Sequence, residues 1–259
     1  MKDFKTIIVE KERNIALVTL NRPDIMNAID QLMIDELLLA CRDISDDQEI
    51  RAVIITGAGK AFQSGADIAE LAKMSPIDIL RWNEGLVKIT ALLEGMPAPV
   101  IAAINGAAMG GGLELALACT FRVASAGAKL ALPEVRLGII PGAGGTQRLP
   151  RLIGKSRAAK IILTAEILSA EQALAIGLVD DIALNGDCIE VSKELASQIL
   201  KNGSTACQMA KDAMEVGLRL PLNDAIQYAQ KNLSVCFSTD EMHEGFSAFI
   251  EKRPPKFEI

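Results

Sequence analysis

The first half of the chain alternates short apolar runs with amphipathic stretches. A continuous apolar run bounded by turn residues predicts a buried strand, and apolar residues at three- to four-residue spacing predict a helix. Apolar runs predict strands over residues 5–10, 15–20, 52–57, 98–106, 121–126 and 129–135. Amphipathic spacing and an apolar stretch predict helices over residues 30–44, 75–97 and 110–118. The pattern is therefore a repeat of roughly two strands and one helix.

Beyond Gly145 the pattern becomes almost entirely helical. Helices are predicted over residues 145–165, 169–177, 188–202, 205–220, 222–237 and 239–252, with one short strand over 178–184. No linker rich in Pro, Gly or Ser separates the two halves. We therefore expect an α/β core with a helical region that packs against it.

Composition and charge narrow the function classes. Half of the 259 residues are hydrophobic but only 3% are aromatic, so the core is expected to consist of Ala, Val, Ile and Leu. The net charge of −6 argues against a nucleic-acid partner, which would require a basic face. The beginning of the chain lacks a signal-peptide pattern, and no apolar run suits a membrane span. Five widely spaced cysteines without a C-x-x-C motif predict reduced thiols and a cytoplasmic protein.

The scarcity of two residue types restricts the chemistry further. His243 is the only histidine and Tyr228 the only tyrosine, and His243 lies in a charged segment near the end of the chain. A catalytic triad or a zinc site is therefore not expected, and no metal is predicted. Carboxylates remain for acid–base chemistry.

A glycine run directly precedes an apolar helix in the segment "GGGLELALAC", residues 110–119. The only carboxylate there is Glu114, although an unpaired buried charge costs several kcal/mol. A strand that enters a glycine run before a helix leaves backbone N–H groups free for a phosphate or a developing oxyanion. Close packing of helix on strand would explain the glycines equally well. The spacing matches neither the phosphate-loop nor the dinucleotide-binding motif.

A second loop of similar character is "GKAFQSGADIAEL", residues 59–71. Gly65 permits unusual dihedral angles there, which would leave the N–H groups of Ala66 and Asp67 free. An ordinary turn with Asp67 as a helix cap is the alternative. If both loops leave neighbouring core strands, they can present two amide donors to one carbonyl oxygen.

A second carboxylate, Glu134, follows the predicted strand in "LALPEVRLG". A strand, a turn and a second strand separate it from Glu114, so the chain can return both side chains to one cleft. Two carboxylates in apolar surroundings repel each other and separate their pKa values, which allows one to act as acid and the other as base. The alternative for Glu134 is a surface carboxylate at a strand end.

Several segments together resemble the enoyl-CoA hydratase (crotonase) family. They are "LNRPDIMNAI", "AFQSGADIAEL", "AAINGAAMGGGLELALACTFRVAS", "LALPEVRLGIIPGAGGTQRLPRLIGKSRA" and "EGFSAFIEKRPPKF", which span nearly the whole chain. The resemblance implies an α/β fold, a spiral of repeated ββα units with a C-terminal helical trimerisation region. It implies a catalytic core over residues 1–195 and a helical region over 196–259 for trimerisation and covering of the active site. It also implies a homotrimer or a dimer of trimers.

The same resemblance implies an activity and its residues. Ala66 and Gly111 would supply the oxyanion-hole N–H groups for the thioester carbonyl of an acyl-CoA, Glu114 would activate water, and Glu134 would deliver the proton to Cα. The implied reaction is reversible syn hydration of a trans-2-enoyl-CoA, with a short acyl chain favoured. Coenzyme A enters only as part of the substrate, so no cofactor is expected. The substrate-binding residues implied are Ala66, Asp67, Ile68, Ala69 and Gly111.

Two positions depart from the family pattern. Many relatives carry a basic residue where this chain has Asp24 or Ala69. Binding of the CoA phosphates is therefore assigned to Arg22, Lys252 and Lys256 as candidates.

Other branches of the family remain as alternatives. A Δ3–Δ2 isomerase typically keeps only the carboxylate at the position of Glu134, so the presence of both glutamates favours hydration. A hydratase for a cyclic or branched substrate stays open. Non-catalytic binding of acyl-CoA or RNA is disfavoured by the paired glutamates and the acidic charge.

Overall fold

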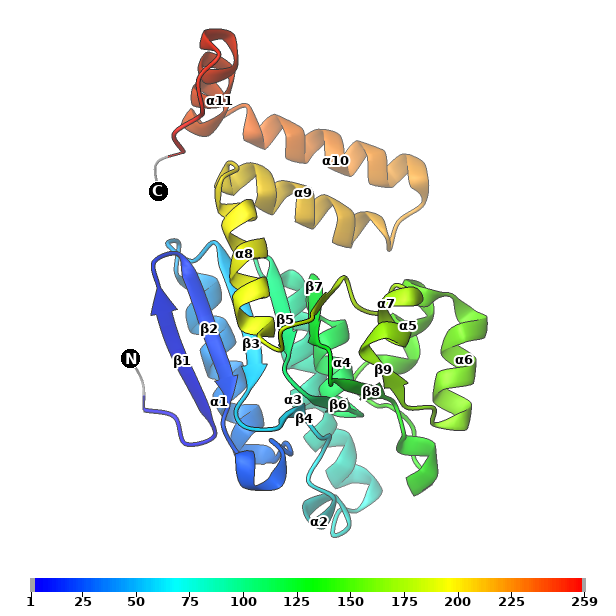
Figure 1. Ribbon diagram of the computed structural model, residues 1–259. Coiled ribbons are helices and arrows are strands. Elements are labelled where there is room, and N and C mark those ends of the chain that lie inside the picture. The colour runs from blue at the N-terminus through cyan, green and yellow to red at the C-terminus, as the bar shows by residue number, and fades with distance from the viewer. Residues whose placement is uncertain (1–2, 258–259) are drawn as a thin grey trace.

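The computed structural model describes residues 3–257 and contains two β-sheets flanked by helices (Figure 1). The larger sheet has the strand order β1-β2-β3-β5-β7-β10, and only β1 runs antiparallel to its neighbour. Its strands are β1 (Ile7–Glu12), β2 (Ile15–Leu20), β3 (Ala52–Gly57), β5 (Val100–Ile104), β7 (Phe121–Ser125) and β10 (Asp181–Ala183). Strands β3 and β5 are buried throughout, as expected where helices cover both faces of a parallel sheet.

A smaller sheet has the order β4-β6-β8-β9. Its members are β4 (Ala61–Gln63), β6 (Ala107–Met109), β8 (Lys129–Ala131) and β9 (Leu168–Ser169). Strands β4, β6 and β8 are parallel, and β9 pairs antiparallel with β8. Three times in succession the chain adds one strand to the larger sheet and the next to the smaller one: β3 then β4, β5 then β6, β7 then β8. Each such pair of strands is followed by a helix, so the structure repeats a unit of two strands and one helix.

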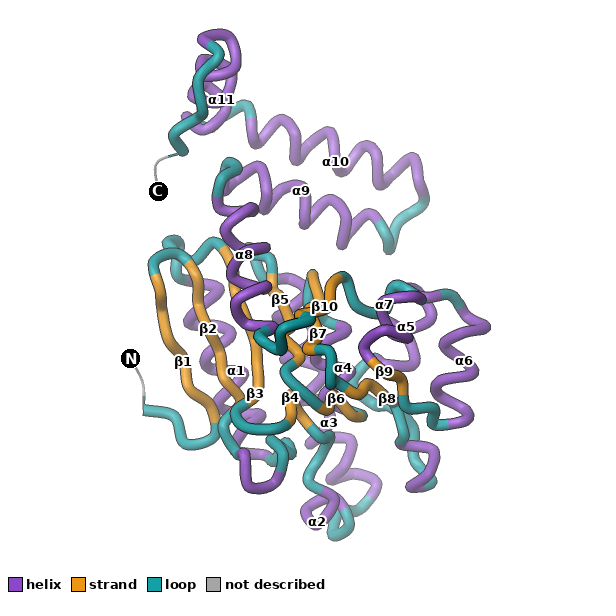
Figure 2. Tube along the Cα trace, in the orientation of Figure 1, coloured by secondary structure: helices purple, strands orange, loops and turns teal. Residues whose placement is uncertain are grey.

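Helices follow the strand pairs and cover the sheets (Figure 2). They are α1 (Gln31–Asp46), α2 (Ile68–Leu71), α3 (Pro76–Gly95), α4 (Gly111–Leu117), α5 (Gly145–Ile153), α6 (Lys155–Thr164) and α7 (Ala170–Ala175), with 3₁₀ turns η1 (Pro23–Ile25) and η2 (Glu134–Leu137). The side chain of Asp30 caps α1, and Ser75 with Asp78 forms a capping box on α3. Both long helices therefore begin where the sequence predicts.

The C-terminal region consists of α8 (Cys188–Leu200), α9 (Ser204–Gly217), α10 (Leu222–Cys236) and α11 (Asp240–Glu251). Helix α8 packs on β3, β5 and β7, and α9 packs along α10. In Figure 1, α9, α10 and α11 lie beyond one end of the larger sheet and project from the body of the molecule. The predicted division at residue 195 falls within α8 and stays a prediction.

Three expectations from the sequence differ from the structure. The helix predicted over 145–165 is two helices, because Gly154 has φ +85° and breaks the backbone between α5 and α6. The strand predicted over 129–135 ends at Ala131, and Glu134 lies in a 3₁₀ turn that follows Pro133. Strands β4 and β6 lie in segments interpreted as loops, and β9 lies in no predicted strand.

One further expectation concerns membranes. Among the helices of residues 3–257, none combines the length and the apolar composition that a membrane crossing requires.

Candidate active site

The ends of three neighbouring strands define one edge of the smaller sheet. Because β4, β6 and β8 are parallel and adjacent, their carboxyl ends meet at the same edge. The segments that follow them carry Ala66, Gly111 and Glu134, respectively. A cavity of about 650 Å³ opens at this edge and is lined by all three residues and by Glu114. The four residues to which the resemblance assigns the central roles therefore face one space.

Most of the remaining lining of this cavity is apolar, and Ser64 and Asn83 are its other polar side chains. Its volume lies within the range of about 300–1,000 Å³ that is usual for small-molecule sites. Helix α3 supplies one wall and the segment after η2 another. The large apolar side chains in the lining include Leu71, Ile79, Leu80, Trp82, Leu86, Leu137, Ile139 and Ile140. Such a mostly apolar lining suits an acyl group.

The backbone on either side of Ala66 pairs with Ile29 in an isolated, strand-like contact. Ile29 donates its N–H to Gly65 O at 2.9 Å, and Asp67 donates to Ile29 O at 2.9 Å. Gly65 has φ +104°, and its N–H donates to Oε1 of the buried Gln63 at 3.0 Å. The N–H of Ala66 is left without an acceptor among the described residues.

The amide of Gly111 is free for a different reason. Gly111 is the first residue of α4, so its N–H lies outside the intrahelical hydrogen bonds. The preceding Gly110 has φ +54° and donates its own N–H to Ala131 O at 2.9 Å, which ties the loop to β8. A Cβ on Gly110 would lie 3.9 Å from the Cα of Gly65. The two loops that carry the free amides are therefore in contact.

Glu114 is almost completely buried, with 3% of its surface exposed. Its Oε1 accepts hydrogen bonds from the N–H of Ala143 at 2.8 Å and of Gly145 at 2.7 Å. Burial raises the pKa of Glu114, and these two amides together with the charge of Arg148 partly oppose the rise. One oxygen is thus anchored, and the Oε2 atom remains available to a ligand.

Glu134 has the more strongly perturbed carboxyl group. Burial raises its pKa to about 7, and the negative charge of Glu114 adds to the rise. Its Oε2 is buried and has no hydrogen-bond partner among the described residues. A Cβ on Gly110 would lie 3.0 Å from Oε1 of Glu134, so only glycine leaves room for this carboxyl group. The pair therefore contains one carboxyl group that exchanges its proton near neutral pH.

The raised pKa of Glu134 predicts a pH-dependent stability. The unfolded chain ionises this group near its ordinary pKa of 4.5, whereas the folded chain keeps it protonated up to about 7. The folded state therefore loses stability as the pH rises from about 4.5 to about 7. Because the side chain is partly solvated, we expect a loss of about 1–2 kcal/mol.

Chemical denaturation across this pH range measures the effect. Glu134→Gln is expected to gain stability over the parent protein as the pH rises, with no further gain above about pH 7. Glu84→Gln, which alters an exposed carboxylate of α3, serves as the control. A difference between Glu134→Gln and the parent that is the same at all pH values would contradict the raised pKa.

The other predicted substrate-binding residues divide into two groups. Ile68 lines the cavity, whereas Asp67 and Ala69 do not. The Asp67 carboxylate caps α2 by accepting a hydrogen bond from the N–H of Ala69 at 3.1 Å. Arg22 forms ion pairs with Asp30 at 3.0 Å and Asp67 at 3.8 Å, so its charge is engaged close to the cavity.

The two candidate lysines lie elsewhere. Lys252 ends α11 with φ +55°, and the N–H of Lys256 donates to Glu244. Neither lysine lines the cavity, and Figure 1 shows α11 at the opposite end of the molecule from α2. Within one chain these lysines are not brought to the predicted site.

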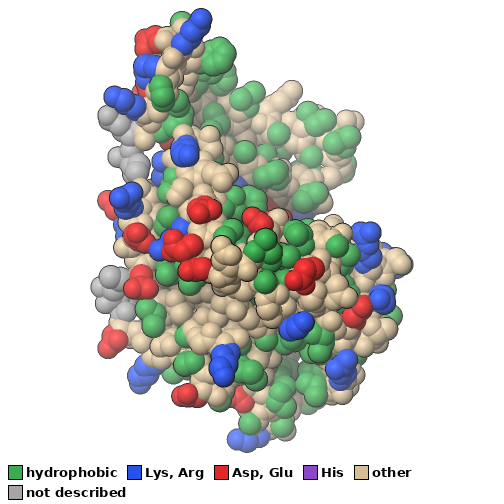
Figure 3. Space-filling model, viewed as in Figure 1, with side chains coloured by type: hydrophobic (Ala, Val, Ile, Leu, Met, Phe, Trp, Pro, Cys, Tyr) green, Lys and Arg blue, Asp and Glu red, His purple; other side chains and the backbone are tan. Residues whose placement is uncertain are grey.

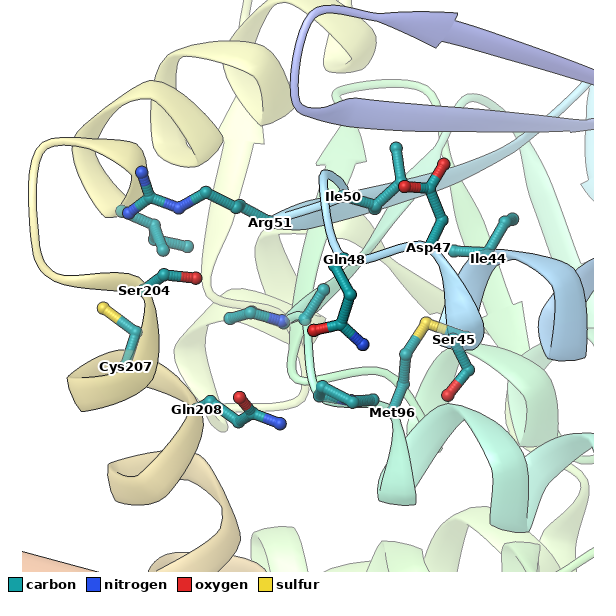
Figure 4. Close-up of a pocket in the computed structure, with 14 residues that line it drawn as sticks. Ile44, Ser45, Asp47, Gln48, Ile50, Arg51, Met96, Ser204, Cys207 and Gln208 are labelled. Atoms are coloured by element: carbon teal, nitrogen blue, oxygen red, sulfur yellow. The ribbon is translucent and has the colours of Figure 1, made fainter. Parts of the chain in front are cut away.

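A second, small cavity lies between the end of α1 and the beginning of α9 (Figure 4). Its volume is about 60 Å³, which corresponds to about two water molecules. The guanidinium of Arg51 enters this region, and its Nε has no hydrogen-bond partner among the described residues. The cavity holds none of the predicted site residues and is too small for an acyl group.

Several residues that shape the site were not singled out from the sequence. Asn27 is buried and donates to three carbonyl oxygens around β4, those of Ala58, Ala61 and Phe62. Gln63 fixes the Gly65 turn, and residues 142–145 hold Glu114. The glycines of "GAGG" are a visible signal for the last of these, whereas nothing in the local pattern marks Asn27 or Gln63.

The described residues contain no cluster of three or more His, Cys, Asp or Glu side chains that could hold a metal ion. The expectations of no metal and no separate cofactor stay predictions.

Comparisons with known proteins identify the family of this chain. The family model described as enoyl-CoA hydratase/isomerase matches residues 10–259. The chain is 40% identical to the short-chain-enoyl-CoA hydratase of Clostridium acetobutylicum over 97% of each chain. It is also 40% identical to the crotonyl-CoA hydratase of Syntrophomonas wolfei over 98% of each chain.

The fold also matches that of solved structures. The crystal structure of enoyl-CoA hydratase from Bacillus anthracis superposes with a TM-score of 0.94 at 39% identity and covers 98% of this chain and 99% of that one. The predicted α/β class with repeated ββα units and C-terminal helices is confirmed. The chain therefore belongs to the enoyl-CoA hydratase/isomerase family.

Proposed function

We propose that the protein is an enoyl-CoA hydratase, a carbon–oxygen lyase that reversibly adds water to a trans-2-enoyl-CoA. The observation that carries the proposal is the placement of two carboxyl groups, Glu114 and Glu134, in one cavity with the free amides of Ala66 and Gly111. The named hydratases at 40% identity support the same reaction.

The two amides act on the thioester. Attack of water at Cβ moves negative charge onto the thioester oxygen, and hydrogen bonds that strengthen with this charge lower the barrier. Ala66 and Gly111 supply such donors from backbone that is fixed before the substrate binds. No reorganisation is then required when the charge develops.

The two carboxyl groups divide the proton transfers. Glu114 is anchored through Oε1, so Oε2 accepts a proton from the attacking water, which forms the bond to Cβ. Glu134, with a pKa of about 7, donates its proton to Cα of the enolate and holds the same water. Both groups act from the same cavity, which fits addition of H and OH to one face.

Loss of the conjugated enoyl-thioester absorbance of crotonyl-CoA tests the proposal directly. The purified protein is expected to remove this absorbance and to form 3-hydroxybutyryl-CoA. A folded protein that leaves the absorbance unchanged with short, long and branched enoyl-CoA substrates would overturn the hydratase assignment.

A Δ3–Δ2 isomerase is the second candidate, because Glu134 alone could move a proton between two carbons of an acyl-CoA. Product analysis in ¹⁸O-labelled water separates the two reactions. Hydration incorporates the label, whereas isomerisation leaves the product unlabelled.

We infer a short acyl chain as the preferred substrate. Trp82 and Leu86, both almost fully buried, form part of the cavity wall supplied by α3. The two relatives named above carry short-chain and crotonyl substrates in their names. A series of kcat/KM values from C4 to C16 enoyl-CoA is expected to fall with chain length.

We also propose a cytoplasmic protein. The five cysteines are all unpaired, as expected in a reducing compartment.

Self-association is proposed from the surface of the C-terminal region. Apolar side chains gather on α9, α10 and α11 and the segments that join them (Figure 3), and contiguous exposed apolar surface marks interaction sites. The exposed members include Met214, Leu218, Leu222, Ile226, Leu233, Phe246, Phe249 and Ile250. We propose that these residues form the contacts of a homotrimer or a dimer of trimers.

Light scattering after size exclusion measures the association. The protein is expected to elute with three or six times the monomer mass, and Phe249→Asp is expected to shift it toward the monomer. Leu163→Asp on α6, also at an exposed apolar residue, is the matched control. A monomeric parent protein would contradict the proposal.

A further inference from the structure

The loop of residues 142–145 holds Glu114 through two of three consecutive peptide groups. The first peptide group donates the N–H of Ala143 to Glu114 at 2.8 Å, while its carbonyl, that of Gly142, accepts from Asn83 Nδ2 at 2.9 Å. The third donates the N–H of Gly145 to the same oxygen at 2.7 Å. The orientation of these peptide planes therefore sets where the Glu114 carboxylate lies.

The middle peptide group is held by Arg148, from α5. Its carbonyl, that of Ala143, accepts from Arg148 Nη1 at 2.8 Å and from Thr90 Oγ1 at 3.4 Å. The guanidinium occupies the space next to Gly144, because a Cβ on that glycine would lie 1.9 Å from Nη1. This middle peptide group joins the two whose N–H groups bind Glu114, so a displacement of its ends at Ala143 and Gly144 would move both donors.

Arg148 is itself fixed by an ion pair with α3. Its Nε donates to Glu94 Oε1 at 2.6 Å, and the other oxygen of Glu94 lies 3.3 Å from Arg219. The buried Lys211 of α9 donates to the carbonyl oxygens of Glu94 and Met96 and so anchors the end of α3. The guanidinium therefore links a rigid helix end to the loop.

We propose that Arg148 is a positioning residue for the hydration reaction: through the carbonyl of Ala143 it holds the two amides that orient Glu114. This inference rests on the proposed function. Arg148 does not line the cavity, so it acts through the loop and not on the substrate. Its guanidinium makes one hydrogen bond to Glu94 and another to the loop from two different nitrogen atoms, a fixed planar fork that a lysine side chain lacks.

The charge of Arg148 has a second effect. It lowers the pKa of Glu114 and so favours the ionised form that accepts the proton of water. Two other charged groups interact directly with Arg148 or Glu114. Glu134 lines the same cavity as Glu114, and Glu94 on α3 pairs with Arg148 and also contacts Arg219. Removal of the guanidinium alone is therefore expected to raise the pKa of Glu114.

Steady-state kinetics of three variants test the proposal with crotonyl-CoA. Arg148→Gln is expected to lower kcat by roughly 10- to 100-fold with little change in KM, because the base is misplaced while the binding surface is intact. The acid limb of its kcat profile is expected to move to higher pH. Arg148→Lys keeps the charge, so its acid limb stays in place while kcat still falls several-fold. Arg151→Gln, one turn further along α5, is the matched control, because among residues 3–257 the Arg151 side chain hydrogen-bonds only Gln147.

The outcomes separate this inference from the proposed function. A parent protein without hydratase activity overturns the function. If the parent is active and Arg148→Gln keeps the parental kcat and pH profile, the role of Arg148 is overturned. An equal loss of kcat in Arg151→Gln overturns it as well. If Arg148→Gln does not fold, Arg148→Lys decides, because a parental kcat there contradicts the need for the fork. The ¹³C NMR titration of Glu114, assigned by its absence in Glu114→Gln, reads the same pKa shift without turnover.

Discussion

Glu114→Gln and Glu134→Gln are each expected to lower kcat for crotonyl-CoA hydration by about 10²- to 10⁴-fold. The amide at position 114 can still accept the two hydrogen bonds of Ala143 and Gly145, so the loop stays in place while the base is lost. The amide at position 134 has no acidic proton to deliver at neutral pH. KM is expected to change little in both variants, because neither group holds the CoA part of the substrate.

The double variant gives a sharper result than either single change. If the two carboxyl groups act on one water in one transition state, the effects of the two substitutions on kcat are not additive. The double variant is then expected to have a kcat only slightly below that of the less active single variant. Glu84→Gln controls for loss of a carboxylate elsewhere on the surface. Full activity in either single variant would remove that carboxyl group from the mechanism.

The second large effect is expected from Gly111→Pro. Proline removes the backbone N–H and suits the first position of a helix, which Gly111 occupies in α4. Loss of one oxyanion donor typically costs about 10²–10³ in kcat. We therefore expect a fall of this size when Gly111→Pro is compared with Gly111→Ala.

Gly111→Ala is the matched control because it keeps the N–H. A Cβ at this position meets no protein atom within 4 Å, so the backbone can stay as it is. Equal kcat values for the two variants, both with an unchanged circular dichroism spectrum, would show that the amide of Gly111 does not stabilise the transition state.

Hydropathy predicts the larger sheet well, because its strands are five or six residues long apart from β10, and the central strands β3, β5 and β7 are buried almost throughout. Of the smaller sheet, whose strands have two or three residues, it predicts only β8, and it misses β4, β6 and β9. A run this short has no detectable period, and pairing with distant neighbours alone makes it a strand. The break at Gly154 was also not predicted, because the apolar spacing continues across it.

The candidate site also contains one part that the sequence predicts and another that it does not. Glu114 can be singled out from the sequence because a carboxylate among Leu113 and Leu115 requires a reason. The partners that hold it, the amides of Ala143 and Gly145, belong to backbone about 30 positions away, and hydrogen bonds of backbone leave no mark on residue type. The role of Arg148 is hidden for the same reason, since its partners are a carbonyl oxygen and a glutamate on another helix.

The order β4-β6-β8 has a consequence for how such a scaffold can change its chemistry. Each of these strands delivers one functional group at its end, and each group arrives from a separate turn of the chain. A substitution after β8 exchanges the proposed proton donor, Glu134, without touching the amides of Ala66 and Gly111 that follow β4 and β6. New reactions on thioesters can therefore arise by altering one turn at a time, while enolate stabilisation is inherited unchanged.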